Sequence, residues 1–247
     1  MKLDKICLAS MVLVAGSLQG ALLTVNFDNT GTEAVGTVGN SISRTNGLFT
    51  VVASAWSNPG IGSTFQQAAL GIYGSAGLGV CNQSELSLPS GCNATGNPTP
   101  HQIDNAGGYD FVKFQFTGAG SIPYSVTNVT VSIGTLAGDW DVSFWLGDTN
   151  TANFPDGLTF AQVSTALGAQ TDILSGSIPS PFNVGLGVSR VGNTLLFGPQ
   201  NGGDLNDGFK IKSVSFETTV NGVPEPSTYA LIGAGLLGLG YWRRKQA

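Results

Sequence analysis

Apolar and polar side chains alternate through the middle of the chain, which is the pattern of β-strands with one buried face. Leu23, Val25 and Phe27 share one face of the first such stretch, and the residues between them share the other. The same period returns at 49–53, 112–116, 129–133, 142–146, 182–188, 195–197 and 209–217. Gly, Asn, Asp and Pro separate these stretches, and no long helical pattern intervenes. The sequence therefore predicts an all-β fold, an antiparallel β-sandwich of jelly-roll type.

Finer features of the pattern predict local structure. The last strand loses its phase between Ile211 and Val214, which indicates a bulge. Lys210 and Lys212 in the same strand are typical of a sheet edge. Two stretches, 63–71 and 159–168, start with a hydroxyl residue, carry glutamine three positions later and end in glycine. That is the spacing of a capped helix, so a short helix is predicted in each.

The N-terminus has the features of a secretory signal peptide. Lys2 and Lys5 precede an uncharged run over 6–16, and small residues follow around 17–21. We therefore assign residues 1–20 to a signal peptide. The β-sandwich domain is expected over 21–220, about 200 residues, an ordinary size for one sandwich.

An uncharged stretch over 229–242 precedes Arg243, Arg244 and Lys245 at the C-terminus. As a helix it would rise roughly 21 Å, against a hydrocarbon core of roughly 30 Å. Extending the helix back to Ser227, with the basic side chains reaching outward, brings it close to a thin bilayer. This predicts a single transmembrane helix with its basic cluster in the cytoplasm. The alternative is a buried C-terminal helix.

Segment 223–247 places Pro224, Glu225 and Pro226 before that helix and basic cluster. In this order the three features resemble the PEP-CTERM sorting domain of exported bacterial proteins. The resemblance implies that an exosortase, an integral-membrane enzyme, recognises these three residues and removes the tail. It also implies that the mature protein goes to the cell surface or the extracellular matrix, where exopolysaccharide is an expected partner. Prolines suit such a role because they keep the recognised segment extended.

The charge of the chain argues against a nucleic-acid partner. The chain has ten basic and fifteen acidic residues, a net charge of −5. Half of the basic residues lie in the two ends, but only Asp4 and Glu225 among the acids do, so the body is the more acidic part. Phosphate binding needs clustered Lys and Arg.

Cys81 and Cys92 are the cysteine pair of the exported body, so a disulfide between them is predicted. A two-thiol metal site is the alternative.

Acidic residues gather around this pair, in a segment over 78–116 that resembles one recurring among PEP-CTERM proteins. Glu85, His101, Asp104 and Asp110 could hold a cation, and Ca²⁺ is favoured in a carboxylate-rich extracellular loop. The alternative is a hydrogen-bonded loop scaffold that needs no cofactor.

A second acidic segment contains Asp204, Asn206 and Asp207. It has the start of a Ca²⁺ loop but not the later glutamate of an EF-hand, and a turn before the last strand explains it equally well.

Asp139, Asp141 and Trp145 share a strand face and could contact a glycan. The two carboxylates could also serve a polysaccharide hydrolase, and a solvated strand end is the third interpretation. The chain has one histidine and neither G-x-S-x-G nor H-E-x-x-H, so nucleophilic and zinc-protease chemistry are not predicted. We therefore expect a non-catalytic surface or matrix protein. The alternatives are a carbohydrate-binding module, with or without calcium, and a hydrolase.

Overall fold

A computed structural model describes residues 20, 22–28, 37–86, 101–135, 140–174, 182–187, 190–203, 207–218 and 235. Contacts divide the chain into a body, Ala21–Thr219, and a unit made of the two ends. Almost all of the second unit lies outside the described residues, as do the predicted signal peptide, sorting motif, C-terminal helix and basic cluster. Within the described part of the chain, no helix is long and apolar enough to cross a membrane.

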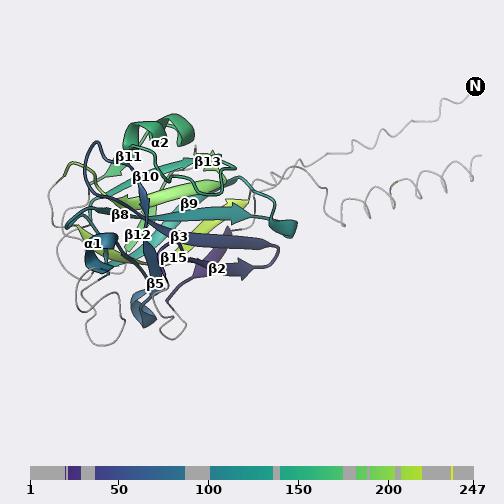
Figure 1. The fold of residues 1–247 in the computed structure, drawn as a ribbon. Helices are drawn as coiled ribbons and strands as arrows, with labels where there is room; N and C mark the ends of the chain where they lie inside the picture. The colour runs from purple at the N-terminus through teal and green to yellow at the C-terminus, as the bar shows by residue number, and fades with distance from the viewer. Residues whose placement is uncertain are drawn as a thin grey trace, which may run out of the picture. The chain divides into compact units, whose positions relative to one another are not determined.

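The body consists of two sheets, and every described strand pairing is antiparallel (Figure 1). The eight-stranded sheet has the order β12-β9-β15-β6-β5, with β1 and β7 on β15 and β13 on β9. Its strands are β1 (Leu22–Asn26), β5 (Ala69–Ile72), β6 (Leu78–Cys81), β7 (Ile103–Asp104), β9 (Val126–Thr135), β12 (Phe182–Gly185), β13 (Val191–Gly192) and β15 (Gly208–Thr218).

The seven-stranded sheet has the order β11-β10-β14-β8-β3-β2, with β4 on β3. Its strands are β2 (Ser41–Asn46), β3 (Phe49–Asn58), β4 (Gln66–Gln67), β8 (Tyr109–Thr117), β10 (Val142–Gly147), β11 (Thr171–Ile173) and β14 (Thr194–Pro199). The helices are α1 (Gln83–Leu86), α2 (Phe160–Leu167) and the short 3₁₀ turns η1 (Gly74–Ala76) and η2 (Ala119–Ser121). The predicted all-β, antiparallel class is confirmed, while the jelly-roll connectivity stays a prediction.

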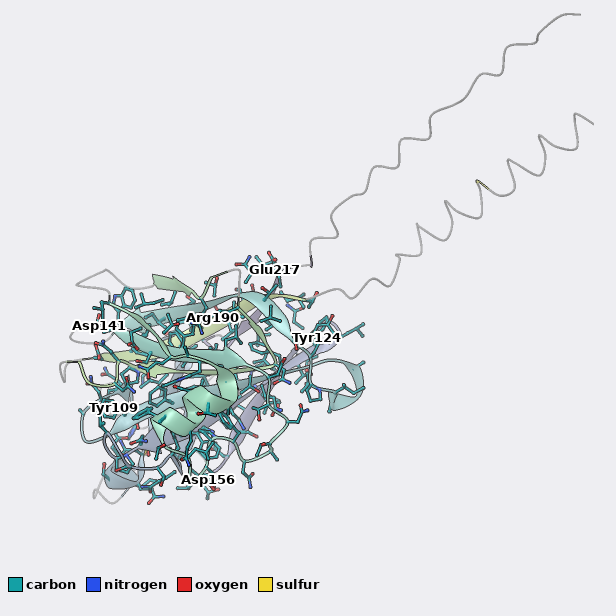
Figure 2. All side chains as sticks on the ribbon, turned by 90° about the horizontal axis from the view of Figure 1, so that it is seen from above. Tyr109, Tyr124, Asp141, Asp156, Arg190 and Glu217 are labelled. Carbon is teal, nitrogen blue, oxygen red and sulfur yellow. The ribbon has the colours of Figure 1, made fainter. Side chains whose placement is uncertain are left out.

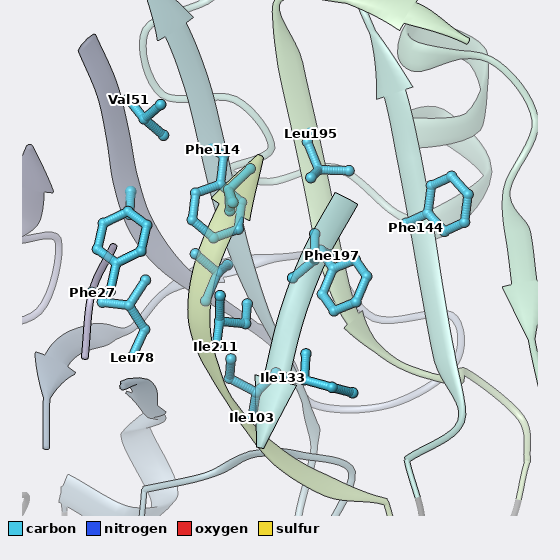
Figure 3. Packing of buried hydrophobic residues seen from close by; sticks show 14 of the residues in the cluster. Phe27, Val51, Leu78, Ile103, Phe114, Ile133, Phe144, Leu195, Phe197 and Ile211 are labelled. Atoms are coloured by element: carbon cyan, nitrogen blue, oxygen red, sulfur yellow. The ribbon is translucent and has the colours of Figure 1, made fainter. Parts of the chain in front are cut away.

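The main core lies between the two sheets. Phe114 and Phe197 from the seven-stranded sheet meet Ile133 and Ile211 from the eight-stranded sheet, and all four are fully buried (Figure 3). These residues occupy the apolar positions of the alternating pattern. Burying each large side chain contributes about 1.5 to 3 kcal/mol.

A second apolar cluster covers part of the outer face of the seven-stranded sheet. Trp145 of β10, Phe111 of β8 and Leu196 of β14 pack there beneath α2, together with Phe160 of that helix. Because of this cluster, several strands of the seven-stranded sheet are buried on both faces.

Two local predictions are confirmed. The register between β15 and β9 shifts between Ile211 and Ser213, at the predicted bulge. Helix α2 begins after Thr159, whose Oγ1 accepts from the backbone N–H of Gln162 at 3.4 Å, while Gln162 Oε1 accepts from the N–H of Thr159 at 2.8 Å. The C-terminal cap is Gly168, as predicted.

The helix predicted over 63–71 is wrong. Residues from this stretch form β4 and β5 instead, and all four residues of β5 are buried. The backbone N–H of Ala68 donates to the carbonyl of Ala55 at 3.1 Å, so the stretch follows β3. Pairing and burial in the folded body outweigh the local capping signal.

The edge position predicted for the last strand is also wrong. β15 pairs with β9 on one side and with β1, β6 and β7 on the other. Lys210 is fully buried within it, so this lysine does not protect a free edge.

Candidate functional site

Asn82, between β6 and α1, organises the first candidate site. Its Oδ1 accepts from the backbone N–H groups of Ser84 and Glu85 at 3.0 and 3.1 Å. Glu85 Oε2 in return accepts from the N–H of Asn82 at 2.9 Å. These reciprocal bonds start α1 and fix the Glu85 carboxylate at the end of β6.

Asp110 and Asp104 complete a group that we call the carboxylate cluster (Glu85, Asp104 and Asp110). Asp110 lies near the start of β8, opposite Ser57 of β3, and is fully buried. Its two oxygens accept long hydrogen bonds from Asn82 Nδ2 at 3.3 and 3.4 Å. Asp104 of β7 accepts from the N–H of Ala106 at 3.0 Å. Figure 2 labels the neighbouring Tyr109, at the end of the body opposite Tyr124.

Burial and mutual repulsion favour the protonated forms of these acids. Burial, helped by the charge of Glu85, raises the pKa of Asp104 to about 7. Burial, with repulsion by Asp104 and Glu85, raises the pKa of Asp110 well above its ordinary range. Burial also raises the pKa of Glu85, against the bonds from Asn82 and His101 and the charge of Lys210. The cluster therefore holds negative charge at a substantial cost.

Lys210 is the cation beside this cluster. Its Nζ donates to the carbonyl of His101 at 3.2 Å and lies 3.8 Å from the ring centroid of Tyr73. Burial lowers the pKa of Lys210 to about 8, although Glu85 opposes the shift. Of the three carboxylates in the cluster, Glu85 is the one whose charge acts on this ammonium.

His101 is the remaining member of the predicted metal set. It is 3% exposed, has a φ of 82° and stacks on Tyr73 with centroids 5.5 Å apart. Burial and the charge of Lys210 lower its pKa, so the ring is neutral. Neither ring nitrogen has a hydrogen-bond partner in the described part of the chain, and one lies within 4.8 Å of ligand atoms of Glu85 and Cys81. Of the predicted metal set, the structure thus brings His101 close to Glu85, and the metal site stays a prediction.

Cys81 is buried and is a disulfide cysteine, so its sulfur is no thiolate ligand. Its predicted partner Cys92 lies outside the described residues, and the pairing of the two stays a prediction.

In the second predicted acidic segment, Asp207 forms hydrogen bonds within the fold. The oxygens of Asp207 accept from Asn105 Nδ2 at 2.8 Å and from the N–H of Asp141 at 2.9 Å. Asp207 therefore connects the segments that precede β10 and follow β7. Asp204 and Asn206 lie outside the described residues.

The predicted glycan contact through Trp145 is wrong. Trp145 is fully buried beneath α2, where its Nε1 donates to Ser164 Oγ at 2.9 Å and its ring stacks on Phe160. The alternation predicted the correct strand face, but the helix covers it. Asp139 lies outside the described residues, and Asp141 lies at an end of the body (Figure 2).

A pocket that the sequence did not predict lies over β2, β3 and β8. This Lys113 pocket has a volume of about 190 Å³. It is lined by Gly39, Ser41, Val52, Ser54, Ala55, Trp56, Gln67, Lys113, Gln115, Ala152 and Asn153. Ser54 pairs with Lys113 and Val52 with Gln115, so strand register places these side chains together. The available signal was the polar face of the strand around 112–116.

Among the described residues, Lys113 is the only charged one that lines this pocket, and it is 6% exposed. Its Nζ donates to the carbonyl of Ala152 at 3.2 Å and lies 5.5 Å from the ring centroid of Trp56. Burial lowers the pKa of Lys113, and no described carboxylate pairs with it.

The match that comparison with known proteins found lies in the C-terminal tail. The family model of the PEP-CTERM protein-sorting motif matches residues 222–245. The chain carries a PEP-CTERM sorting motif. The predicted resemblance is thereby confirmed, and the motif indicates an exported protein that an exosortase sorts. No curated protein and no solved structure matches the chain.

Proposed function

We propose that the body of this PEP-CTERM protein acts without catalysis at the cell surface or in the extracellular matrix. The observation that carries the proposal is the sorting motif at 222–245, which directly follows a body ending at Thr219. In this proposal the C-terminal helix holds the precursor in the membrane until an exosortase cuts near Pro224, Glu225 and Pro226. The mature body then associates with exopolysaccharide.

The positions of two acids, Asp110 and Asp207, support a non-catalytic role. A hydrolase must bring two carboxylates to a glycosidic bond. Asp110 is fully buried and Asp207 is 3% exposed, and the oxygens of both already accept hydrogen bonds. In this arrangement neither of the two carboxylates is free to act on a glycosidic bond.

Processing can be tested by mass spectrometry of the protein from the producing cell. We expect the wild-type protein in the external fraction to end upstream of Tyr229. A variant in which Pro224, Glu225 and Pro226 are all alanine should keep Ala247 and stay with the membrane. Gln246→Ala, outside the matched residues, is the control and should be processed normally. External wild-type protein with an intact Ala247 would overturn the proposal.

The absence of catalysis is tested on the exopolysaccharide of the producing cell. The purified protein should stay with the washed polymer and release no reducing ends. Release of reducing ends that disappears in Asp141→Asn would show a hydrolase instead.

A calcium-stabilised body is a second proposal, favoured by the repulsion among the buried Asp110 and the half-buried Glu85 and Asp104, and by the ring nitrogens of His101, for which no described residue is a hydrogen-bond partner. Carboxylate oxygens predominate in this set, as Ca²⁺ prefers. Chelator should lower the melting temperature of the purified protein, and Ca²⁺ should restore it. Asp104→Asn should abolish the shift, whereas the exposed Asp156→Asn should keep it. No shift in the wild type, or a larger one with Zn²⁺ than with Ca²⁺, would count against calcium.

A further inference from the structure

The Lys113 pocket contains a buried cation for which the described part of the chain supplies no balancing charge. An ammonium has three N–H donors, and one donor of Lys113 is used by the Ala152 carbonyl. The face of Trp56 attracts the charge but accepts no conventional hydrogen bond. By contrast, Lys210 has both a carbonyl and the nearby Glu85 carboxylate. Lys113 therefore has N–H donors that no described residue accepts, and it lines a pocket at a position where desolvation disfavours charge.

The rest of the lining favours a ligand with several hydroxyl groups. Ser41, Ser54, Gln67, Gln115 and Asn153 offer hydroxyl and amide groups around the ammonium, and no acid lies among the lining residues. Amide and hydroxyl side chains both donate and accept, which suits sugar hydroxyls. The pocket therefore combines one positive charge with several neutral polar contacts.

The size of the pocket limits the ligand. A volume of about 190 Å³ lies below the roughly 300 Å³ at which pockets for drug-sized ligands begin. One pyranose unit of a longer chain is a suitable size. The ammonium already lies over Trp56, so this ring forms a wall and not a free platform on which a neutral sugar would stack.

We propose that the Lys113 pocket binds a uronate unit of an acidic polysaccharide, with its carboxylate on Lys113 Nζ. The inference rests on the proposed matrix role, because that role supplies the polymer, and it names the sugar class. The carboxylate of the uronate accepts hydrogen bonds from the N–H groups of Lys113 Nζ. The Ser, Gln and Asn side chains of the lining contact the hydroxyl groups of the sugar. Because the body is acidic overall, the local charge of this lysine decides where a polyanion can bind.

Isothermal titration calorimetry with the processed exported protein tests the proposal. The probes are tri-galacturonate and its uncharged counterpart, tri-galactose. Tri-galacturonate should bind at least about tenfold more tightly, which is the effect expected of a charge-assisted hydrogen bond. Equal binding of the two sugars, or no binding of either, would overturn the proposal.

Lys113→Met is the decisive variant because methionine keeps much of the lysine stem and removes the charge. It should lower the affinity for tri-galacturonate about ten- to a hundredfold. The melting temperature should not fall, since the variant removes a buried charge that lacks a charged partner. Lys212→Met, in β15 of the other sheet, is the matched control and should bind as the wild type does. Unchanged binding in Lys113→Met would overturn the proposal.

Two further measurements keep the test independent of folding and of sorting. Gln115→Leu retains Lys113 and should weaken tri-galacturonate binding severalfold; no loss would count against this pocket. Inorganic sulfate should bind much more weakly than tri-galacturonate, and equal binding would reduce the site to a general anion site. Protein that is processed normally but binds no uronate would overturn this inference and leave the proposed sorting and location intact.

Discussion

Gly79→Ala tests the close packing on which the carboxylate cluster depends. Gly79 lies in β6, and a Cβ atom there would be 1.9 Å from the carbonyl oxygen of His101 and 2.9 Å from Cε2 of Tyr73. Real Cβ contacts essentially never fall below 3.0 Å, so the His101 backbone would have to move by about 1 Å. That oxygen is also the acceptor for the buried ammonium of Lys210.

The expected loss of stability follows from these two contacts. Overpacking a well-packed site costs about 1 to 3 kcal/mol. Weakening the hydrogen bond of a buried charge adds about 1.5 to 3 kcal/mol. We therefore expect a loss of about 2.5 to 6 kcal/mol, a large part of the about 5 to 15 kcal/mol that holds a typical domain folded.

Urea unfolding followed by tryptophan fluorescence measures this loss as a fall in the midpoint at constant slope. Gly185→Ala is the matched control, because Gly185 also lies in a strand of the eight-stranded sheet but a Cβ there meets nothing within 4 Å. The control should change stability by less than about 1 kcal/mol. If Gly79→Ala unfolds within about 1 kcal/mol of the wild type, β6 does not pack on His101 as described.

Three other predictions use the same unfolding measurement. Thr159→Ala removes the N-terminal cap of α2 and should cost about 1 kcal/mol, whereas no loss would show that the capping box is not formed. Asp207→Ala removes the acceptor of two hydrogen bonds, from the Asn105 amide and the Asp141 N–H, and should cost about 1 to 3 kcal/mol; a neutral effect would contradict this connection. In chelator, the pKa of Asp104 is about 7 in the folded state, above its ordinary value of 3.8, so the folded state binds this proton more tightly than the unfolded state does. Stability should therefore rise as the pH falls from about 8 to about 5, and be lost as the pH rises through 7. A midpoint that rises with pH over this window would refute the assignment.

The fold was predictable where one physical pattern dominated. Alternation over 112–116 and 129–133 identified the strands, because their apolar faces meet in one core. The bulge near Ile211 was visible as a lost phase for the same reason. The stretch 63–71 misled because its capping signal is read within the stretch alone, whereas β4 and β5 form by pairing with β3 and β6, the neighbouring strands on either side of it.

The candidate sites were also predictable only where their residues lie close together in the sequence. Glu85, His101, Asp104 and Asp110 were predicted together because they lie in one short segment that leads into a strand. Trp145 was placed on the correct face, but alternation cannot tell that α2 covers that face. The Lys113 pocket was missed for a related reason, since its lining from Ala152 and Asn153 comes from a distant loop.

The two buried lysines of the body show how burial alone fails to assign a role. Both lie in strands, both contact an aromatic ring and a carbonyl oxygen, and burial lowers the pKa of each. They differ in that Lys210 has the Glu85 carboxylate nearby, while Lys113 has no described carboxylate and lines a pocket. A buried charge whose partner lies in the same chain is satisfied by folding, so it belongs to the scaffold. A buried charge that lines a pocket without such a partner gains most from an anion that arrives from outside, and for that reason we assign binding to Lys113 and structure to Lys210.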